Sequence, residues 1–486
     1  MASSTPTLAS TSHIQAKFFT KQTEYAIPDV PYSLPVNVSP KELNDIIYSV
    51  LYEGETEKTA AFDFLIHGEL LRSSLDVYLE DKEISTESVF EIEYIERQAA
   101  PRPETSLSHD DWVSCVRGNN NLIACGCYDN TVKLWTRDGH CLTTIPGHSG
   151  PVKCVTWLKN TDEDDEHLFA SGSHDQTAFV WRWKAAKKEI DCLYALRGHS
   201  GSVDCIAVNE DGERVVTGSW DKTIKLWTAN NPSPEEKERD DSESAHQPKK
   251  IKSSGHKMIT RVPLLTLGGH KEAVSSALWL DDSNVCTASW DHTLRTWDMS
   301  RAEQTQILEG SKAFFQIAHS PLSNLIVSAS ADRHVRLHDL RTKEMKGTYT
   351  SHAGWVSSVD WSKSDEHLFV SGSHDCLMKL WDTRSPKAPL YNMIGQEEKI
   401  LAVDWSIPDL MLSGGVEVIL FADDLALLAQ NEDLEQASSL LQQGLECIEK
   451  WSKKWKMTLN VDKCEVTHFS KWTKEASWGL NVTVSC

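Results

Sequence analysis

Histidine, aspartate and tryptophan recur along the chain in one order, and the first two can exchange protons. A His beside an Asp is the usual arrangement of a general base and the group that orients it. Here, however, an Asp is followed six residues later by Trp again and again, within turn-forming phrases such as "SWDKT" at 219–223. This repetition favours a structural role, in which the carboxylate accepts backbone N–H bonds while the His and Trp hold adjacent strands together. We therefore predict no catalytic residue among them.

The spacing of these residues predicts the elements that position them. The aspartates are Asp129, Asp175, Asp221, Asp291, Asp332 and Asp375; the tryptophans are Trp135, Trp181, Trp227, Trp297 and Trp381; and the histidines are His148, His199, His270 and His352. Successive aspartates are 46, 46, 70, 41 and 43 residues apart, so one period carries an insertion. Each period holds short strand-like runs, for example 203–208, 214–219 and 223–228. A repeat of about 40–45 residues with these signatures is typical of a WD-repeat β-propeller.

The composition sets further bounds. A chain of 486 residues can hold two or three domains, and its net charge of −22 argues against attraction of nucleic acid by the whole molecule. The twelve cysteines lack the spacing of a disulfide framework or a zinc site, so we expect reduced thiols, no metal and no cofactor. We expect no secretion signal, and no apolar run reaches membrane-spanning length. We expect no membrane partner and a location in the cytosol or nucleus.

A small α+β domain is predicted at residues 13–97. "IQAKFF" at 14–19 alternates like a half-buried strand, and "FDFLI" and "FEIEYIE" are further strands. Between them, 39–53 has the apolar spacing of an amphipathic helix, with Ser39 as its N-cap, Pro40 at its first position and Glu42 completing a capping box. This order suits a ubiquitin-like roll. The polar, proline-containing segment 98–106 is predicted to be a linker, and the propeller is expected to span 107–422.

The long insertion, 229–262, is predicted to be a disordered surface loop because it has no aromatic and few aliphatic residues. Its charges segregate, with acidic residues first and then "PKKIK". Lys249, Lys250 and Lys252 therefore form a candidate nuclear-import run. A solvated linker is the alternative interpretation of the same residues.

The stretch "FDFLIHGELLRSSLDVYLEDKEISTESVFEIEYIE" resembles the Notchless-like domain of nucleolar WD-repeat proteins. That resemblance implies binding to the AAA ATPase midasin, with Glu87 completing the coordination of the partner's metal; a solvated loop carboxylate is the alternative. Together with "GSVDCIAV", "SASWDHTLRTWD" and "DTRSPKAPLY", residues 13–415 resemble the WD-repeat ribosome biogenesis factors of the PeBoW complex. The resemblance implies a nucleolar and nucleoplasmic scaffold that joins pescadillo and block-of-proliferation proteins on pre-60S particles, for maturation of large-subunit ribosomal RNA. A substrate receptor of a ubiquitin ligase is the alternative for such a propeller.

From Val416 the chain resembles a different family, the reverse transcriptases of non-LTR retrotransposons. "FADD" at 421–424 matches their metal-binding hairpin, so Asp423 and Asp424 would be vestigial polymerase carboxylates. The third carboxylate and the fingers have no counterpart here, and about 70 residues are too few for a template cleft, so we predict no polymerase activity. We expect 416–422 to replace the third strand of an aberrant seventh blade, with the segment before Asp110 as its fourth strand. The remainder, 423–486, is predicted to be a helical or irregular tail, in which apolar residues between 434 and 448 share one face of a helix.

Overall fold

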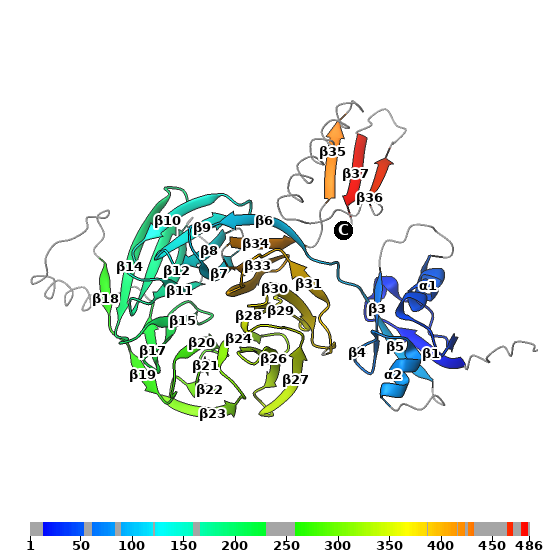
Figure 1. Ribbon diagram of the computed structural model, residues 1–486, viewed down its shortest axis with the longest axis horizontal. Helices are drawn as coiled ribbons and strands as arrows, with labels where there is room; N and C mark the ends of the chain where they lie inside the picture. The colour runs from blue at the N-terminus through cyan, green and yellow to red at the C-terminus, as the bar shows by residue number, and fades with distance from the viewer. Residues whose placement is uncertain are drawn as a thin grey trace, which may run out of the picture. The chain divides into compact units, whose positions relative to one another are not determined.

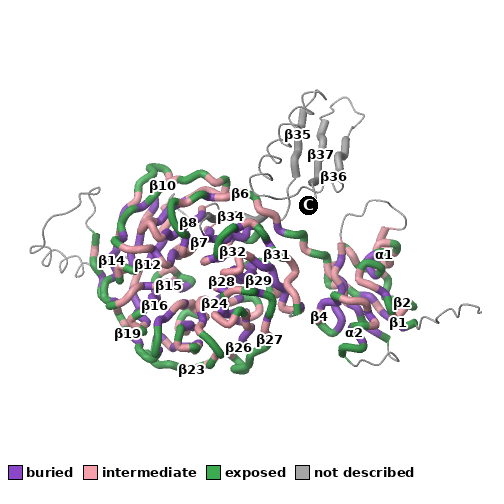
Figure 2. Tube along the Cα trace, viewed as in Figure 1, coloured by how far each residue is buried: buried purple, intermediate pink, exposed green. Residues whose placement is uncertain are grey.

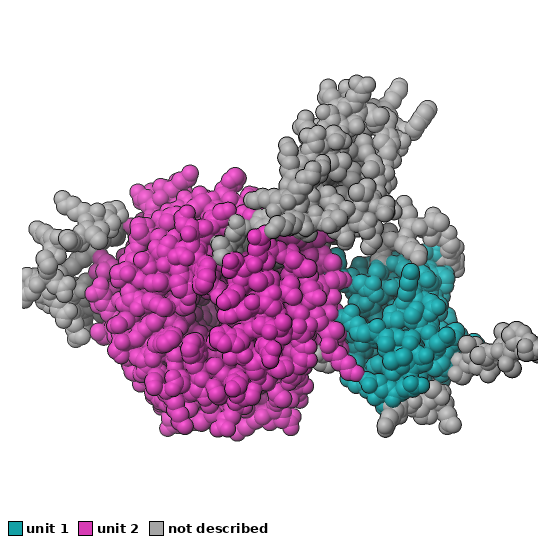
Figure 3. All heavy atoms as spheres, viewed as in Figure 1, with its two compact units in different colours: residues 1–99 teal, residues 100–486 magenta. Residues whose placement is uncertain are grey.

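The computed structural model describes side chains at residues 13–52, 61–82, 89–119, 122–158, 166–229, 258–385 and 387–415, and beyond these only the backbone of four strands between 417 and 484. The chain divides into two compact units, 1–99 and 100–486, which Figure 3 colours separately. Most of the described secondary-structure elements are strands. The predicted mainly-β class, with a ubiquitin-like domain and a propeller, is therefore confirmed.

The first unit is one mixed sheet with two helices. Its strand order is β2-β1-β5-β3-β4, and β1 and β5 pair in parallel. In chain order the elements are β1 (His13–Phe19), the 3-10 turn η1 (Thr23–Tyr25), β2 (Tyr32–Pro35), α1 (Pro40–Leu51), β3 (Phe62–Ile66), β4 (Glu69–Leu70), α2 (Leu75–Asp81) and β5 (Phe90–Glu96). Apolar side chains from the sheet and both helices form its core.

Helix α1 begins as the sequence predicts and is held to the sheet by one polar side chain. The Ser39 hydroxyl accepts the Glu42 N–H, and the Glu42 carboxylate accepts the Ser39 N–H at 2.8 Å, which completes the capping box. Buried Asn44 donates to the Phe62 carbonyl at 3.1 Å and accepts the Phe62 N–H at 3.0 Å. These two bonds satisfy the backbone at the start of β3 and fix the helix against it.

The second unit holds seven sheets that form a ring (Figure 1). Blades 1 to 3 are β7 (Val113–Asn119), β8 (Leu122–Cys127), β9 (Thr131–Thr136) and β10 (Cys141–Pro146); β11 (Val152–Trp157), β12 (Glu166–Ser173), β13 (Thr177–Lys184) and β14 (Glu189–Arg197); and β15 (Val203–Val208), β16 (Arg214–Ser219), β17 (Thr223–Thr228) and β19 (Leu265–Gly268). Blades 4 to 6 are β20 (Val274–Trp279), β21 (Asn284–Ser289), β22 (Thr293–Asp298) and β23 (Glu303–Glu309); β24 (Phe314–Ser320), β25 (Leu325–Ser330), β26 (His334–Asp339) and β27 (Glu344–Thr350); and β28 (Val356–Trp361), β29 (Leu368–Ser373), β30 (Leu377–Asp382) and β31 (Tyr391–Ile394). The core lies within and between these sheets, where Figure 2 shows the buried residues in purple.

Blade 7 closes the ring with strands from both ends of the unit. It consists of β32 (Ala402–Ile407), β33 (Leu410–Gly414), β34 (Glu417–Ala422) and β6 (Arg102–Ser108), in that order. The register pairs Gly414 with Val418 and Val418 with Leu107, so the predicted replacement strand and its predicted neighbour are both confirmed. The inner strand β7 contacts β32 on one side and β11 on the other, which completes the ring. Because β6 begins at Arg102, the predicted linker 98–106 ends earlier than expected.

Two other segments differ from the sequence prediction. The last part of the predicted disordered insertion 229–262 contains β18 (Ile259–Arg261), which pairs in parallel with β14 as a fifth strand of blade 2. In the tail, predicted to be helical or irregular, the described residues form an antiparallel sheet. Its strands are β35 (Ala426–Asn431), β37 (Trp478–Val484) and β36 (Cys464–Phe469). The helix face expected over 434–448 lies outside the described residues.

Candidate functional site

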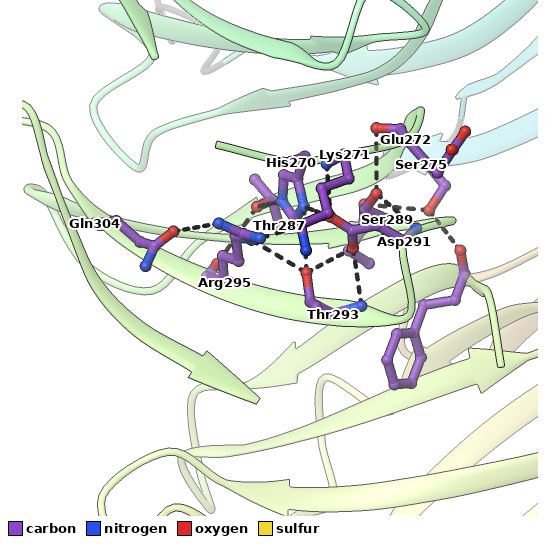
Figure 4. A network of polar contacts seen from close by, with 12 residues as sticks. His270, Lys271, Glu272, Ser275, Thr287, Ser289, Asp291, Thr293, Arg295 and Gln304 are labelled. Atoms are coloured by element: carbon purple, nitrogen blue, oxygen red, sulfur yellow. Dashed lines mark hydrogen bonds and ion pairs between the residues drawn. The ribbon is translucent and has the colours of Figure 1, made fainter. Parts of the chain in front are cut away.

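The repeated His, Asp and Trp side chains meet inside each regular blade, and Figure 4 shows His270, Thr287 and Asp291 of blade 4. The His270 Nδ1–H donates to the Asp291 carboxylate at 2.9 Å, and its Nε2 bonds the Thr287 hydroxyl at 2.8 Å. The Trp297 indole N–H donates to the same hydroxyl at 2.8 Å. Strands β21 and β22 and the loop that enters the blade are thus joined through one buried threonine.

Local turn geometry explains why an Asp is placed here. His292, just after Asp291, has a positive φ of 66°, which costs energy in a residue other than glycine. The Asp291 carboxylate offsets this cost by accepting the Thr293 N–H at 2.9 Å, in addition to the Lys271 N–H at 2.9 Å. The corresponding residue has a positive φ in blades 1 to 6.

Blades 2, 3 and 6 contain the same network. In each of them the His bonds both the Asp and a Ser or Thr hydroxyl at 2.8–2.9 Å, and the Trp donates to that hydroxyl at 2.8 Å. The groups are His148, Asp175, Ser171 and Trp181; His199, Asp221, Thr217 and Trp227; and His352, Asp375, Ser371 and Trp381. The His side chains are 1–2% exposed, and each hydroxyl that they contact also accepts the Trp N–H, so a substrate has no access to these groups.

Blade 1 contains an incomplete version of the network. Asp129 accepts the Thr131 N–H at 2.9 Å but has no His partner, and Cys125 takes the place of the hydroxyl residue. The Trp135 indole nitrogen and the His109 Nε2 are consequently without a hydrogen-bond partner in the structure. The sulfhydryl is a weak acceptor, so this blade lacks the link that the hydroxyl supplies elsewhere.

Blade 5 replaces the usual partners with other polar groups. Asp332 accepts from the Ser311 hydroxyl at 2.6 Å and from the Arg336 guanidinium. His338, at the position of the Trp, bonds the Ser328 hydroxyl at 2.9 Å. Burial and nearby Arg336 lower the pKa of His338 to about 4.

The charge state of the regular networks follows from their surroundings. Burial alone would favour a neutral acid, yet hydrogen bonds from Thr293, the Lys271 backbone and His270 hold the pKa of Asp291 at about 2. Burial, opposed by the bond to Asp291, lowers the pKa of His270. At neutral pH the pair is therefore a carboxylate and a neutral imidazole, which is a stable structural contact.

Three groups of predicted site residues lie outside the described residues. They are Glu87, in the gap at 83–88; Lys249, Lys250 and Lys252, in the gap at 230–257; and Asp423 and Asp424, in the gap at 423–425. Among the side chains that are described, no three His, Cys, Asp or Glu residues form a group able to hold a metal ion. In the same ranges, no helix has the length and apolarity needed to cross a membrane.

A set of aromatic side chains that the sequence reading missed surrounds the mouth of the central channel. In five of the six periods the residue before the repeat Asp is aromatic or His. These residues line a cavity of about 460 Å³ together with two rings from the inner strands and their entering loops. We call this set the aromatic face; its members are Tyr128, His174, Trp220, Trp290, Phe315, Trp355 and His374. The aromatic residue before each turn Asp was the signal that could have revealed it.

The rings of the aromatic face form a continuous apolar strip over blades 3 to 6. The ring centroids of Trp220 and Trp290 are 5.2 Å apart, and those of Trp290 and Phe315 are 6.0 Å apart. The strip continues from Phe315 to Trp355 at 5.7 Å and from Trp355 to His374 at 5.6 Å. The exposed fractions of Trp220 and Trp355 are 47% and 53%. Clustered exposed tryptophans are typical of protein-binding surfaces, since their burial releases much apolar area from water.

Polar contacts hold two of these rings in place. The Lys153 ammonium donates to the Tyr128 hydroxyl at 2.8 Å and lies 4.9 Å from the centroid of its ring. The Trp220 indole N–H donates to the Asp204 carboxylate. These rings are therefore oriented before any partner binds, which lowers the entropy lost on binding.

Comparison with protein families matches three parts of the chain. The NLE (NUC135) domain matches residues 14–79, and the reverse transcriptase (RNA-dependent DNA polymerase) family matches 395–481. The WD domain, G-beta repeat, matches 102–136, 139–182, 190–228, 261–298, 302–339 and 343–382. The first WD match begins with β6, so the repeat unit supplies the outer strand of the preceding blade.

Curated relatives match nearly their whole length. "Ribosome biogenesis protein WDR12 homolog" of Ixodes scapularis is 47% identical over 418 residues, covering 84% of this chain and 98% of the relative. The protein of the same name in Aedes aegypti is 42% identical over 432 residues, covering 86% and 97%. That of Nematostella vectensis is 42% identical over 416 residues, covering 84% and 99%.

Proposed function

The chain belongs to the family of WDR12 ribosome biogenesis proteins, and from that premise we propose that it is a non-catalytic scaffold for assembly of the large ribosomal subunit. In this role it supports maturation of large-subunit ribosomal RNA on pre-60S particles. The observation that carries the proposal is the aromatic face, a preformed apolar surface on a propeller whose repeat His residues are bonded to the repeat Asp residues within the blades.

The propeller is proposed to dock a block-of-proliferation protein on the aromatic face and, through it, a pescadillo protein. Exposed Trp290 and Trp355 are the expected anchors because large aromatic side chains at the centre of an interface carry most of its binding energy.

The first unit is proposed to bind midasin independently of the propeller. Its core is built from its own residues, so it can fold and bind a partner without help from the ring. Glu87 is proposed to complete the partner's metal coordination, and the control is Glu91, an exposed carboxylate on the neighbouring strand β5. Glu87→Ala should abolish midasin binding while Glu91→Ala retains it; equal binding by the two variants would contradict the assignment.

We propose that the protein, because it acts on ribosomal precursors, is located in the nucleus, both in the nucleolus and in the nucleoplasm. Neutralising Lys249, Lys250 and Lys252 together should prevent nuclear import of a fluorescently tagged full chain. Unchanged import would remove these lysines from the proposal.

The docking proposal is tested by calorimetric titration of the full chain with a purified block-of-proliferation protein. Trp290→Ala and Trp355→Ala should each weaken binding by about tenfold or more, as expected for anchors worth over about 1.4 kcal/mol. Leu322→Ala is the matched control, since Leu322 is equally exposed but follows β24 at the opposite end of the strands. If neither tryptophan variant binds the partner more weakly, the partner docks elsewhere on the chain.

Polymerase activity is not part of the proposed function. The reverse transcriptase match covers only the end of the chain, and the reaction needs more metal-binding carboxylates than Asp423 and Asp424. Mg²⁺-dependent primer extension by the full chain that is lost in Asp423→Ala would contradict this.

A further inference from the structure

Three exposed cations surround one end of the aromatic face. Lys312 precedes β24, Arg333 lies in the turn before β26, and Lys399 precedes β32. With Trp355 and His374 they line one open groove over blades 5 to 7. We call Lys312, Arg333 and Lys399 the basic sector.

The basic sector carries a net positive charge on a strongly acidic protein. None of its three side chains has a hydrogen bond or ion pair to any side chain within the described ranges. The nearby Asp332 carboxylate is already occupied by Ser311 and Arg336. Glu398, beside Lys399 on the same loop, marks the limit of the sector. In a chain of charge −22, unpaired cations gathered at one groove indicate an anionic ligand.

The arrangement of the rings favours a protein ligand over a nucleic acid. Binding of single-stranded RNA uses separate aromatic platforms, each with a free face for one base. Here Phe315, Trp355 and His374 pack against one another, with angles of 36° and 35° between successive ring planes, and so form one joined apolar surface. Such a surface suits the aliphatic and aromatic side chains of a polypeptide.

We propose that the basic sector selects an acidic polypeptide segment, whose carboxylates pair with Lys312, Arg333 and Lys399 while its apolar side chains lie on Phe315 and Trp355. The inference rests on the proposed docking of a partner protein at the aromatic face and adds the chemistry of the docked segment. The three cations act as specificity determinants, since rim charges chiefly govern which partner associates and how fast.

The test measures fluorescence anisotropy of labelled probes with the full chain. The probes are a peptide of alternating acidic (Asp, Glu) and apolar (Leu, Phe) residues, its counterpart with Asn and Gln in place of Asp and Glu, and a uridine oligonucleotide. The acidic peptide should bind about tenfold more tightly than the amide peptide, and this preference should weaken as salt is raised. The variant Lys312→Glu, Arg333→Glu, Lys399→Glu should lose the preference.

The matched control is Lys187→Glu, Lys188→Glu, Lys343→Glu, which changes the net charge equally. These three exposed lysines lie in the turns before β14 and β27, at the opposite end of the strands from the basic sector, so this variant should keep the preference. Equal binding of the two peptides, or an unaltered preference in the basic-sector variant, would overturn the inference. Tighter binding of the oligonucleotide, lost in that variant, would overturn it in favour of RNA. A preference for the acidic peptide without binding of the block-of-proliferation protein would reject only the named partner.

Discussion

The repeat aspartates occupy equivalent turns but differ in what they bind, and this difference sets their contributions to stability. The side chain of Asp291 is 3% exposed and joins His270 to two backbone N–H groups, whereas that of Asp129 is 22% exposed, caps its own turn and has only a long contact, 3.9 Å, with the Lys133 ammonium. An isolated carboxylate in a turn is replaced by water at small cost, while loss of a buried acceptor leaves its donors unsatisfied.

We predict that Asp291→Ala lowers the free energy of unfolding by about 3 kcal/mol and Asp129→Ala by about 1 kcal/mol. The reason is that Asp291→Ala leaves His270, 6% exposed, and the Lys271 N–H without an acceptor. Urea unfolding followed by tryptophan fluorescence measures both. Equal effects of the two substitutions would mean that the contact between His270 and Asp291 adds nothing to the free energy of unfolding.

His338 should make the propeller sensitive to acid. An unfolded His takes up a proton near its ordinary pKa of 6.5, but folded His338 does so only near 4. Between these pH values the unfolded chain binds more protons than the folded chain. The contribution of His338 to the free energy of unfolding is therefore complete above pH 6.5 and is lost as the pH falls towards 4. The loss is about 3 kcal/mol, at about 1.36 kcal/mol per pKa unit. We predict that His338→Gln removes this part of the pH dependence. Urea midpoints across the pH range test it, with exposed His140→Gln as the control that keeps the wild-type slope.

At the scale of elements, blade 7 is the exceptional part of the ring. Its third strand β34 lies in a segment that matches the reverse transcriptase family, and the WD repeat matches stop at 382. Side chains on the inner strands nevertheless link blade 7 to its neighbours, blades 6 and 1. The Arg117 guanidinium on β7 is 2.8 Å from the Asp404 carboxylate on β32 and 3.7 Å from Asp360 on β28. Asp404 also accepts the Gly118 N–H at 2.8 Å, so blades 6, 7 and 1 are joined without β34.

We predict that Arg117→Met lowers the free energy of unfolding by about 3 kcal/mol, because it leaves the fully buried Asp404 side chain without its ion partner. Hydrogen exchange at 418–421 should accelerate as the closure loosens, whereas exchange at 223–227 in blade 3 should be unchanged. Arg137→Met is the matched control. Arg137 also bridges blades 1 and 7, at 2.9 Å from Asp409, but both side chains are partly exposed, so the cost should stay within about 1 kcal/mol. Equal effects of the two variants would contradict the assigned role of Arg117.

At the scale of the whole molecule, the protein is two folding units. The core of the first unit is made of residues between Ile14 and Tyr94, and each propeller core cluster is made of residues from Leu107 onward. Units that share no core are expected to unfold independently.

We predict two calorimetric transitions for the full chain, one of which coincides with that of the isolated fragment 1–99. Asn44→Ala should lower only that transition, since it removes both hydrogen bonds to Phe62. Trp361→Ala, at a fully buried position of β28, should lower only the other. A single transition shifted by both substitutions would show that the units are coupled.

The sequence by itself determined the elements, because their signals are local. The runs 203–208, 214–219 and 223–228 became β15, β16 and β17 with the same bounds, and Ser39 and Glu42 marked the start of α1. Strand periodicity, capping and turn aspartates act within a few residues of the chain, so they can be read without knowing the fold.

Only the tertiary structure decided what the ring brings together. Arg117 and Asp404 are 287 residues apart, and the members of the aromatic face come from six blades. The strand β18 was missed because its parallel pairing with β14 depends on a partner more than 60 residues earlier. Such contacts leave no periodic trace along the chain, since closure of the ring, and not local propensity, selects the partners.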